Sequence, residues 1–328
     1  MLLASAMISL SAIISFEFAR LFQAFDYRTF FQLLLGRGWF IWEIGFLIGI
    51  TIFFGMLGSA AGEIFTRTFG IPFTAGSIGL MLIIAFLVFW GSDIIESVLA
   101  SWSFVLYGTY LAFFIWMYGR YDGNIFHVLA SEQIGGGWIK NGAAYAGLQT
   151  SILPAVLFSL RHIKTRKQAI SAGMIVGPIA MIPGIFFYLV MLTHYPQIRD
   201  QILPSNYLLE ALGSRWFQVL FQIVLLGTLI ETGSGVIHAF NERLASLYHS
   251  RNRDLPRALR PAVALALMVT AFALSKLGLV TLILISASTF AWFSLLVFMV
   301  PLLTVGVVKI NRMAGDSTLS TEKADEPQ

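Results

Sequence analysis

The chain has 328 residues, of which 57% are hydrophobic and 12% charged, with a net charge of +4 and a mean hydropathy of +0.80. Soluble domains carry roughly 25% charged residues, so this composition excludes an ordinary soluble protein and predicts an all-α polytopic membrane protein. The small net charge gives no reason to expect a nucleic-acid partner, and the absence of cysteine excludes disulfides, thiolate metal sites and cysteine nucleophiles.

Hydropathy predicts about nine transmembrane helices, each with enough apolar residues to cross the hydrocarbon core of a bilayer. The predicted spans are Leu2–Phe22, Trp39–Phe65, Ile71–Trp90, Ile94–Tyr118, Gly142–Leu160, Ala169–Thr193, Trp216–Phe240, Leu259–Ser275 and Leu279–Val308. The apolar start is expected to be a retained span and not a signal peptide. We expect residues 1–310 to form one transmembrane domain, and the polar, aromatic-free residues 311–328 to form a disordered cytoplasmic tail.

Basic loops predict how the chain is oriented, because Lys and Arg gather on the cytoplasmic side. One such loop is RHIKTRK, Arg161–Lys167, and the other follows Phe240. The second loop contains Arg243, Arg251, Arg253, Arg257 and Arg260. Both loops are expected to face the cytoplasm, and the protein is expected to lie in the inner (cytoplasmic) membrane. The C-terminus is then expected to be cytoplasmic as well. The N-terminus is then left outside, and a chain that begins directly in hydrocarbon suggests that one helix is missing in front of it.

The span Gly142–Leu160 is interrupted near its middle by a polar run and by Pro154. Proline removes a backbone hydrogen bond and disfavours a helical residue before it. Two interpretations stay open: a discontinuous helix whose unwound backbone binds a substrate or ion, and a simple proline kink with glycine packing. The candidate substrate-binding residues are Gly147, Gln149, Thr150 and Ser151.

Glu231 lies near the middle of the span Trp216–Phe240, where a carboxylate facing lipid would cost at least about 3 kcal/mol. Thr228, Thr232, Gly235 and His238 share its side of the helix. Glu231 is a proton or cation site, a protonated carboxyl bonded to a neighbouring helix, or half of an ion pair. We favour the first, with Glu231, Thr232, Thr228 and Ser234 as ion-coupling residues and Na⁺ or H⁺ as the coupling ion.

Other polar residues have structural explanations. Glu17, Glu43 and Glu63 lie near span ends, where interfacial pairing is expected. Gly173 and Gly177 have the spacing of close helix packing. Ser286, Ser288 and Thr289 form a polar notch whose hydroxyls are expected to bond their own or a neighbouring helix. The common hydrolase, metalloprotease and nucleotide-binding motifs are absent, so we expect neither an enzyme nor a cofactor.

Several stretches resemble the YkvI-like membrane proteins, a family grouped with the amino acid, polyamine and organocation transporters of LeuT-like fold. They are AGLQTSILPAVLF running into RHIKTRKQAISAGMIVG, the loop LTHYPQIRDQILPSNYLLEALG, and QIVLLGTLIETGSGVIHAFNERL. The resemblance is best from about Ala143 to Leu244. It implies an inverted-repeat bundle in which the predicted spans are the second to tenth helices, so that the glycine-rich first helix is lacking.

The resemblance further implies a cation-coupled or proton-coupled secondary transporter of a small amine or amino-acid-like solute, working by rocking one helix group against the other. In that fold Gly142–Leu160 is the discontinuous sixth helix, and the eighth, Trp216–Phe240, contributes Glu231 to a cation site. Two alternatives stay open. One is a ligand-sensing receptor subunit built on a transporter fold, and the other is a truncated remnant that no longer transports.

Overall fold

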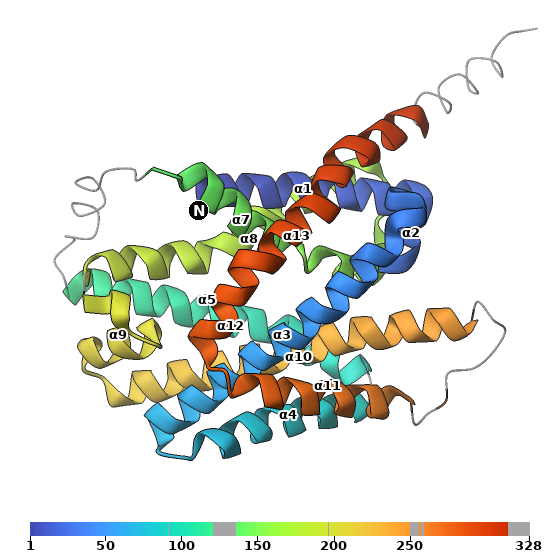
Figure 1. The fold of residues 1–328 in the computed structure, drawn as a ribbon. Coiled ribbons are helices and arrows are strands. Elements are labelled where there is room, and N and C mark those ends of the chain that lie inside the picture. The colour runs from blue at the N-terminus through green and yellow to red at the C-terminus, as the bar shows by residue number, and fades with distance from the viewer. Residues whose placement is uncertain (91, 121–135, 196, 250–255, 257–258, 314–328) are drawn as a thin grey trace, which may run out of the picture. The chain divides into compact units, whose positions relative to one another are not determined.

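The computed structural model describes residues 1–90, 92–120, 136–195, 197–249, 256 and 259–313. Of the described residues, 90% are helical and none lies in a strand. Figure 1 shows the helices and their labels. Arg251, Arg253 and Arg257 of the second basic loop lie outside the described ranges, as do residues 314–328 of the predicted tail.

Among the described residues, five helices are long and apolar enough to cross a membrane, and a bent helix pair would make a sixth. The five are Leu2–Phe22, Tyr27–Phe69, Arg166–Leu192, Arg215–His238 and Leu279–Met313. The prediction of an all-α, multi-pass membrane protein is thereby confirmed at this level. The remaining predicted spans are also helical, but the apolar stretches Phe73–Leu87 and Ala262–Ser275 are shorter.

The chain divides into two compact units. Unit 1 consists of Met1–Leu47, Ile139–Ala180 and Ala287–Gln328, and unit 2 of Ile48–Trp138 and Met181–Ser286. The chain passes from one unit to the other four times: inside α3 (Trp39–Ile64), at the start of α7 (Trp138–Thr150), inside α8 (Arg166–Leu192) and inside the last span.

Unit 1 is built on α1, which matches the first predicted span. Its helical elements are α1 (Leu2–Phe22), α2 (Tyr27–Leu35), η1 (Gly36–Gly38), the start of α3, α7 (Trp138–Thr150), η3 (Leu153–His162), the start of α8, α13 (Ala291–Ser294), η6 (Leu295–Met299) and η7 (Leu302–Gly306). The Asp26 carboxylate caps α2 by accepting from the Thr29 amide at 3.0 Å. The core is aromatic: buried Trp42 stacks on Phe31 at 4.3 Å and on Phe293 at 5.8 Å between ring centroids.

Two glycines of α8 let this helix approach α1 closely. A Cβ atom on Gly173 would lie 2.5 Å from the Ile13 amide nitrogen, and one on Gly177 would lie 2.1 Å from the Ser5 carbonyl oxygen. The Ser9 hydroxyl donates to the Met174 carbonyl at 2.9 Å across the same crossing of α1 and α8. The predicted packing role of the two glycines is confirmed.

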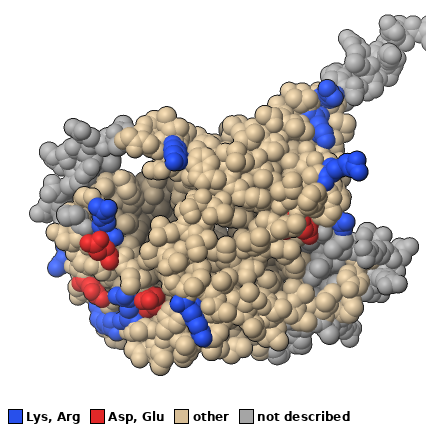
Figure 2. Space-filling model, viewed as in Figure 1, with Lys and Arg blue, Asp and Glu red and all other residues tan. Residues whose placement is uncertain are grey.

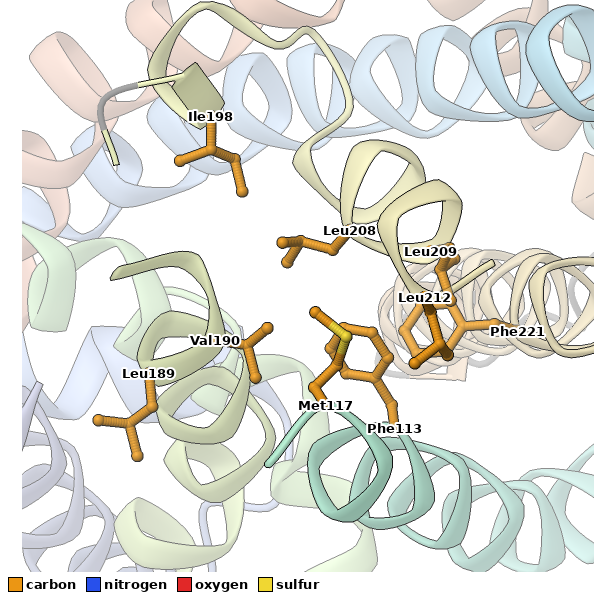
Figure 3. Packing of buried hydrophobic residues seen from close by; sticks show 9 residues of the cluster. All are labelled: Phe113, Met117, Leu189, Val190, Ile198, Leu208, Leu209, Leu212 and Phe221. Carbon is orange, nitrogen blue, oxygen red and sulfur yellow. The ribbon is translucent and has the colours of Figure 1, made fainter. Parts of the chain in front are cut away.

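Unit 2 has its own hydrophobic core, to which a short helix contributes. Its elements are the rest of α3, η2 (Phe65–Phe69), α4 (Phe73–Trp90), α5 (Ser92–Arg120), the end of α8, η4 (Gln197–Asp200), α9 (Pro204–Leu212), α10 (Arg215–His249), α11 (Leu259–Ser275), α12 (Leu279–Ile285) and the first residue of η5 (Ser286–Phe290). Figure 3 shows α9 directing leucines toward α5 and α8. The clustered side chains are Phe113, Met117, Leu189, Val190, Ile198, Leu208, Leu209, Leu212 and Phe221.

A buried polar network fixes α9 to the start of α10. The Asn206 amide oxygen accepts from Gln218 at 2.8 Å and from Gln222 at 3.4 Å, while its amide nitrogen donates to Glu210 at 2.8 Å. Arg215 donates to the Gln218 side chain at 3.0 Å. Because buried amides are costly when unpaired, this network specifies one position for α9.

Two of the predicted interfacial carboxylates form ion pairs. Buried Glu17 accepts from Arg20 at 2.7 and 2.9 Å, and Arg166 lies 4.0 Å away. Glu63 accepts from Arg67 at 2.9 Å, one turn along the helix. The predicted pairing is confirmed for both. The Ser286 hydroxyl contacts the Met56 sulfur at 3.7 Å, so it bonds a neighbouring helix as expected.

The two ion pairs give a stability prediction. Glu17→Gln is expected to lower the free energy of unfolding by about 1–3 kcal/mol, because it removes a charge-assisted, buried bidentate interaction. Glu63→Gln, in the more exposed pair, is expected to change it by less than about 1 kcal/mol. Thermal unfolding of both variants in one detergent measures the difference, and equal losses would contradict the assignment.

Candidate functional site

The predicted interruption of Gly142–Leu160 is a break between two helices of unit 1. The helix α7 ends at Thr150, η3 begins at Leu153, and the two are bent by 54°. Figure 1 shows this bend after α7. Pro154 has no amide hydrogen to donate to the Thr150 carbonyl. The next amide, that of Ala155, donates to the Ile152 carbonyl at 2.9 Å, which is the tighter hydrogen bond of a 3₁₀ turn.

The hydroxyls beside the break satisfy the end of α7. The Thr150 hydroxyl donates to the Gly147 carbonyl at 3.1 Å, and the Ser151 hydroxyl donates to the Leu148 carbonyl at 2.6 Å. Carbonyls at a helix end lack helical amide partners, so these bonds stabilise the interrupted chain. Both oxygens keep lone pairs with which they can accept a further hydrogen bond. Gln149 is half-buried beside them.

Gly147 has a packing role in the break. A Cβ atom there would lie 2.5 Å from the Ala291 carbonyl oxygen and 3.0 Å from the Leu295 Cβ. The absent side chain therefore lets α7 lie directly against α13. Of the four predicted substrate residues, Gly147 is the one that is explained by helix packing alone.

Three buried serines of unit 1 were not predicted. Ser11 and Ser15 lie one turn apart on α1, and Ser294 lies on α13. All three are fully buried, and none of their hydroxyl oxygens has a hydrogen-bond partner among the described residues. Such atoms are uncommon in membrane interiors, where an unsatisfied polar group is costly. Scattered serines in an apolar helix give no signal in sequence that they face the interior.

In unit 2, Glu231 on α10 points to α5. Its carboxylate accepts from the Ser103 hydroxyl at 3.4 Å, and the side chain is half-buried. No described Lys, Arg or His forms an ion pair with it within 4.0 Å. A carboxyl bonded to a neighbouring helix therefore agrees with the described contacts. Its role with a coupling ion stays a prediction.

The other predicted ion-coupling residues bond their own helix or remain unpaired. The Thr228 hydroxyl donates to the Val224 carbonyl at 3.0 Å, and the Thr232 hydroxyl donates to the Thr228 carbonyl at 2.8 Å. Ser234 is fully buried, and its hydroxyl oxygen has no partner in the described part of the chain. Among the described residues, the side chain that hydrogen-bonds to Glu231 is that of Ser103, which the sequence did not point to.

A glycine explains how α5 approaches Glu231. Gly227 lies one turn before Glu231 on the same side of α10, and a Cβ there would lie 1.9 Å from the ring of Trp102. The Trp102 indole nitrogen donates to the Val224 carbonyl at 3.3 Å. Because Ser103 follows Trp102 in α5, this close contact places its hydroxyl beside the carboxylate.

The predicted substrate residues lie in unit 1, and the predicted ion-coupling residues lie in unit 2. Within the described ranges, no cluster of three or more His, Cys, Asp or Glu could hold a metal ion. No protein-family model and no curated protein matches the chain. The likeness to the YkvI-like proteins therefore stays a prediction.

Proposed function

We propose that the chain is a secondary transporter of a small amine or amino-acid-like solute, driven by H⁺ or Na⁺. The observation that carries the proposal is the 54° break between α7 and η3 in an apolar segment of membrane-spanning length. Lipid cannot satisfy irregular backbone, so a break of this kind is tolerated where protein or a cavity surrounds it. Many transporters bind their substrates at such discontinuous helices.

The chemistry of the break favours a solute with an ammonium group. The hydroxyl hydrogens of Thr150 and Ser151 are already donated to backbone carbonyls, so their oxygens can only accept further bonds. An ammonium presents three donors and no acceptor. Ser151 is partly exposed and Thr150 is fully buried, so Ser151 is the residue of the pair that offers an acceptor to a ligand that supplies donors.

Glu231 is the proposed coupling group. A carboxyl at this depth is a functional candidate by default, and its described hydrogen bond comes from the neutral Ser103 hydroxyl. Glu231 can hold a proton, or it can bind a cation together with the oxygens of Thr232 and Ser103. The two compact units of the chain are candidate bodies for the movement that alternating access requires.

The test is uptake into proteoliposomes that contain the full chain. An equimolar mixture of ¹⁴C-labelled amino acids is supplied outside, with an inward H⁺ or Na⁺ gradient. Accumulation above that of protein-free liposomes, abolished when the gradient is dissipated, is the expected result. Saturable binding without accumulation would instead support the ligand-sensing receptor.

A further inference from the structure

A shallow, largely open surface groove lies along one helical segment at the C-terminal end of the last span, within unit 1. Its volume is about 570 Å³. Leu303, Val305, Val307 and Val308 line it, followed along the helix by Lys309 and Arg312. The groove therefore combines an apolar wall with two cations, and it is separate from the broken helix and from Glu231.

The local backbone explains why the apolar wall faces outward. The chain forms a π-helical turn at Leu302–Gly306 directly after Pro301, and such turns often occur at functional positions. Gly306 is buried and would contact Leu34 and Ile14 if it had a side chain, so this side of the turn backs onto α2 and α1. Val305 and Val308 are exposed on the other side, in a segment apolar enough to lie in lipid.

The two cations keep free hydrogen-bond donors. The Lys309 ammonium donates to the Leu33 carbonyl at the end of α2, which fixes its position and uses one of its three hydrogens. Arg312 is exposed and follows one turn later. No described carboxylate forms an ion pair with either residue. Figure 2 shows basic side chains on this end of the helix.

We propose that this groove binds an anionic phospholipid, with the phosphate between Lys309 and Arg312 and an acyl chain along Leu303, Val305 and Val308. Two adjacent cations attract a net negative headgroup and repel the ammonium of a zwitterionic one. A free phosphate would satisfy the cations but would leave the valine side chains without an apolar partner. A phospholipid satisfies both parts of the groove.

The experiment is native mass spectrometry of the full chain in detergent, with dioleoyl phosphatidylglycerol and dioleoyl phosphatidylcholine added in equal amounts. Wild-type protein is expected to retain the anionic lipid preferentially. Arg312→Gln is expected to weaken its retention about fivefold, as removal of one interfacial cation should. Lys309→Gln is expected to have an effect of the same size, and retention of phosphatidylcholine is expected to stay unchanged in both.

Arg161→Gln is the matched control, since Arg161 is an exposed cation elsewhere in unit 1. It is expected to bind both lipids as wild type does. Should Lys309→Gln disturb α2, Arg312→Gln still tests the site, because that side chain is exposed. Wild-type retention by Arg312→Gln, an equal loss in Arg161→Gln, or displacement of the lipid by excess inorganic phosphate would each overturn the proposal.

Discussion

Glu231→Gln is expected to abolish gradient-driven uptake, reducing accumulation at least about tenfold to the level of protein-free liposomes. Glutamine has nearly the same size as glutamate, and its side-chain oxygen can still accept from the Ser103 hydroxyl. It cannot take up a proton, and it supplies no negative charge for a cation. Any loss of transport would therefore reflect ion coupling and not the packing of α5 on α10. Uptake of the labelled amino-acid mixture with and without an imposed gradient measures the effect.

Glu63→Gln is the control for this experiment. Glu63 is also a carboxylate of unit 2, but it pairs with Arg67 on the same helical segment. The Glu63→Gln variant is expected to take up the labelled amino acids at about the wild-type rate. If Glu231→Gln retains full dependence on the gradient, Glu231 is not the coupling group. If wild-type protein accumulates nothing at all, transport itself is wrong whatever the variants do.

Gly227→Ala is expected to destabilise the protein by about 1–3 kcal/mol and to reduce uptake as well. The new Cβ would lie 1.9 Å from Trp102, whose rigid ring is held by its hydrogen bond to Val224. Because Trp102 cannot move without breaking that bond, α5 and α10 must separate. Ser103 would then be drawn away from Glu231. Thermal unfolding in detergent measures the first effect, and the uptake assay measures the second.

Gly235→Ala provides the comparison on the same helix. A Cβ on Gly235 would meet no atom of the described residues within 4 Å. Alanine is a better helix former than glycine by up to about 1 kcal/mol, so this variant is expected to be as stable as wild type or slightly more stable. Equal destabilisation by both substitutions would show that loss of glycine, and not contact with Trp102, is responsible.

The sequence predicted those parts of the fold that have local causes. The first span is Leu2–Phe22 in both the prediction and the structure, because a long apolar run decides it without help from other segments. Pro154 likewise marked the break, since a missing amide hydrogen acts on its own helix. The short helices α2 and α9 were missed. Each has nine residues, which is too few for a hydropathy signal.

The end of α10 was also not predicted. The helix continues from the expected limit at Phe240 to His249. Hydropathy detects where a helix leaves the hydrocarbon, not where it stops, and the residues after Phe240 are polar but still favourable for helix. The predicted membrane-spanning segment is therefore shorter than the helix that contains it.

The surroundings of Glu231 depend on tertiary packing and could be predicted only in part. The sequence showed that Glu231 must be kept away from lipid, but Ser103, which donates a hydrogen bond to its carboxylate, lies 128 residues away in the chain. Thr228 and Thr232 were expected beside the carboxylate, yet their hydroxyl hydrogens go to their own helix. Which lone pairs a threonine leaves free depends on its rotamer and neighbours, and neither is visible in a helical repeat.

The boundaries between the two units have a mechanical consequence. Three of the four boundaries fall inside continuous helices, α3, α8 and the last span, and the fourth falls at the start of α7, so a reorientation of one unit would bend the chain at these positions. Each of the three boundaries inside a helix has a feature that softens it. Gly45 and Gly49 flank the first, Pro178 and Pro183 flank the second, and the π-helical turn Ser286–Phe290 begins at the third. Substitutions that stiffen these three positions are therefore expected to restrict such a reorientation while leaving Glu231 itself unchanged.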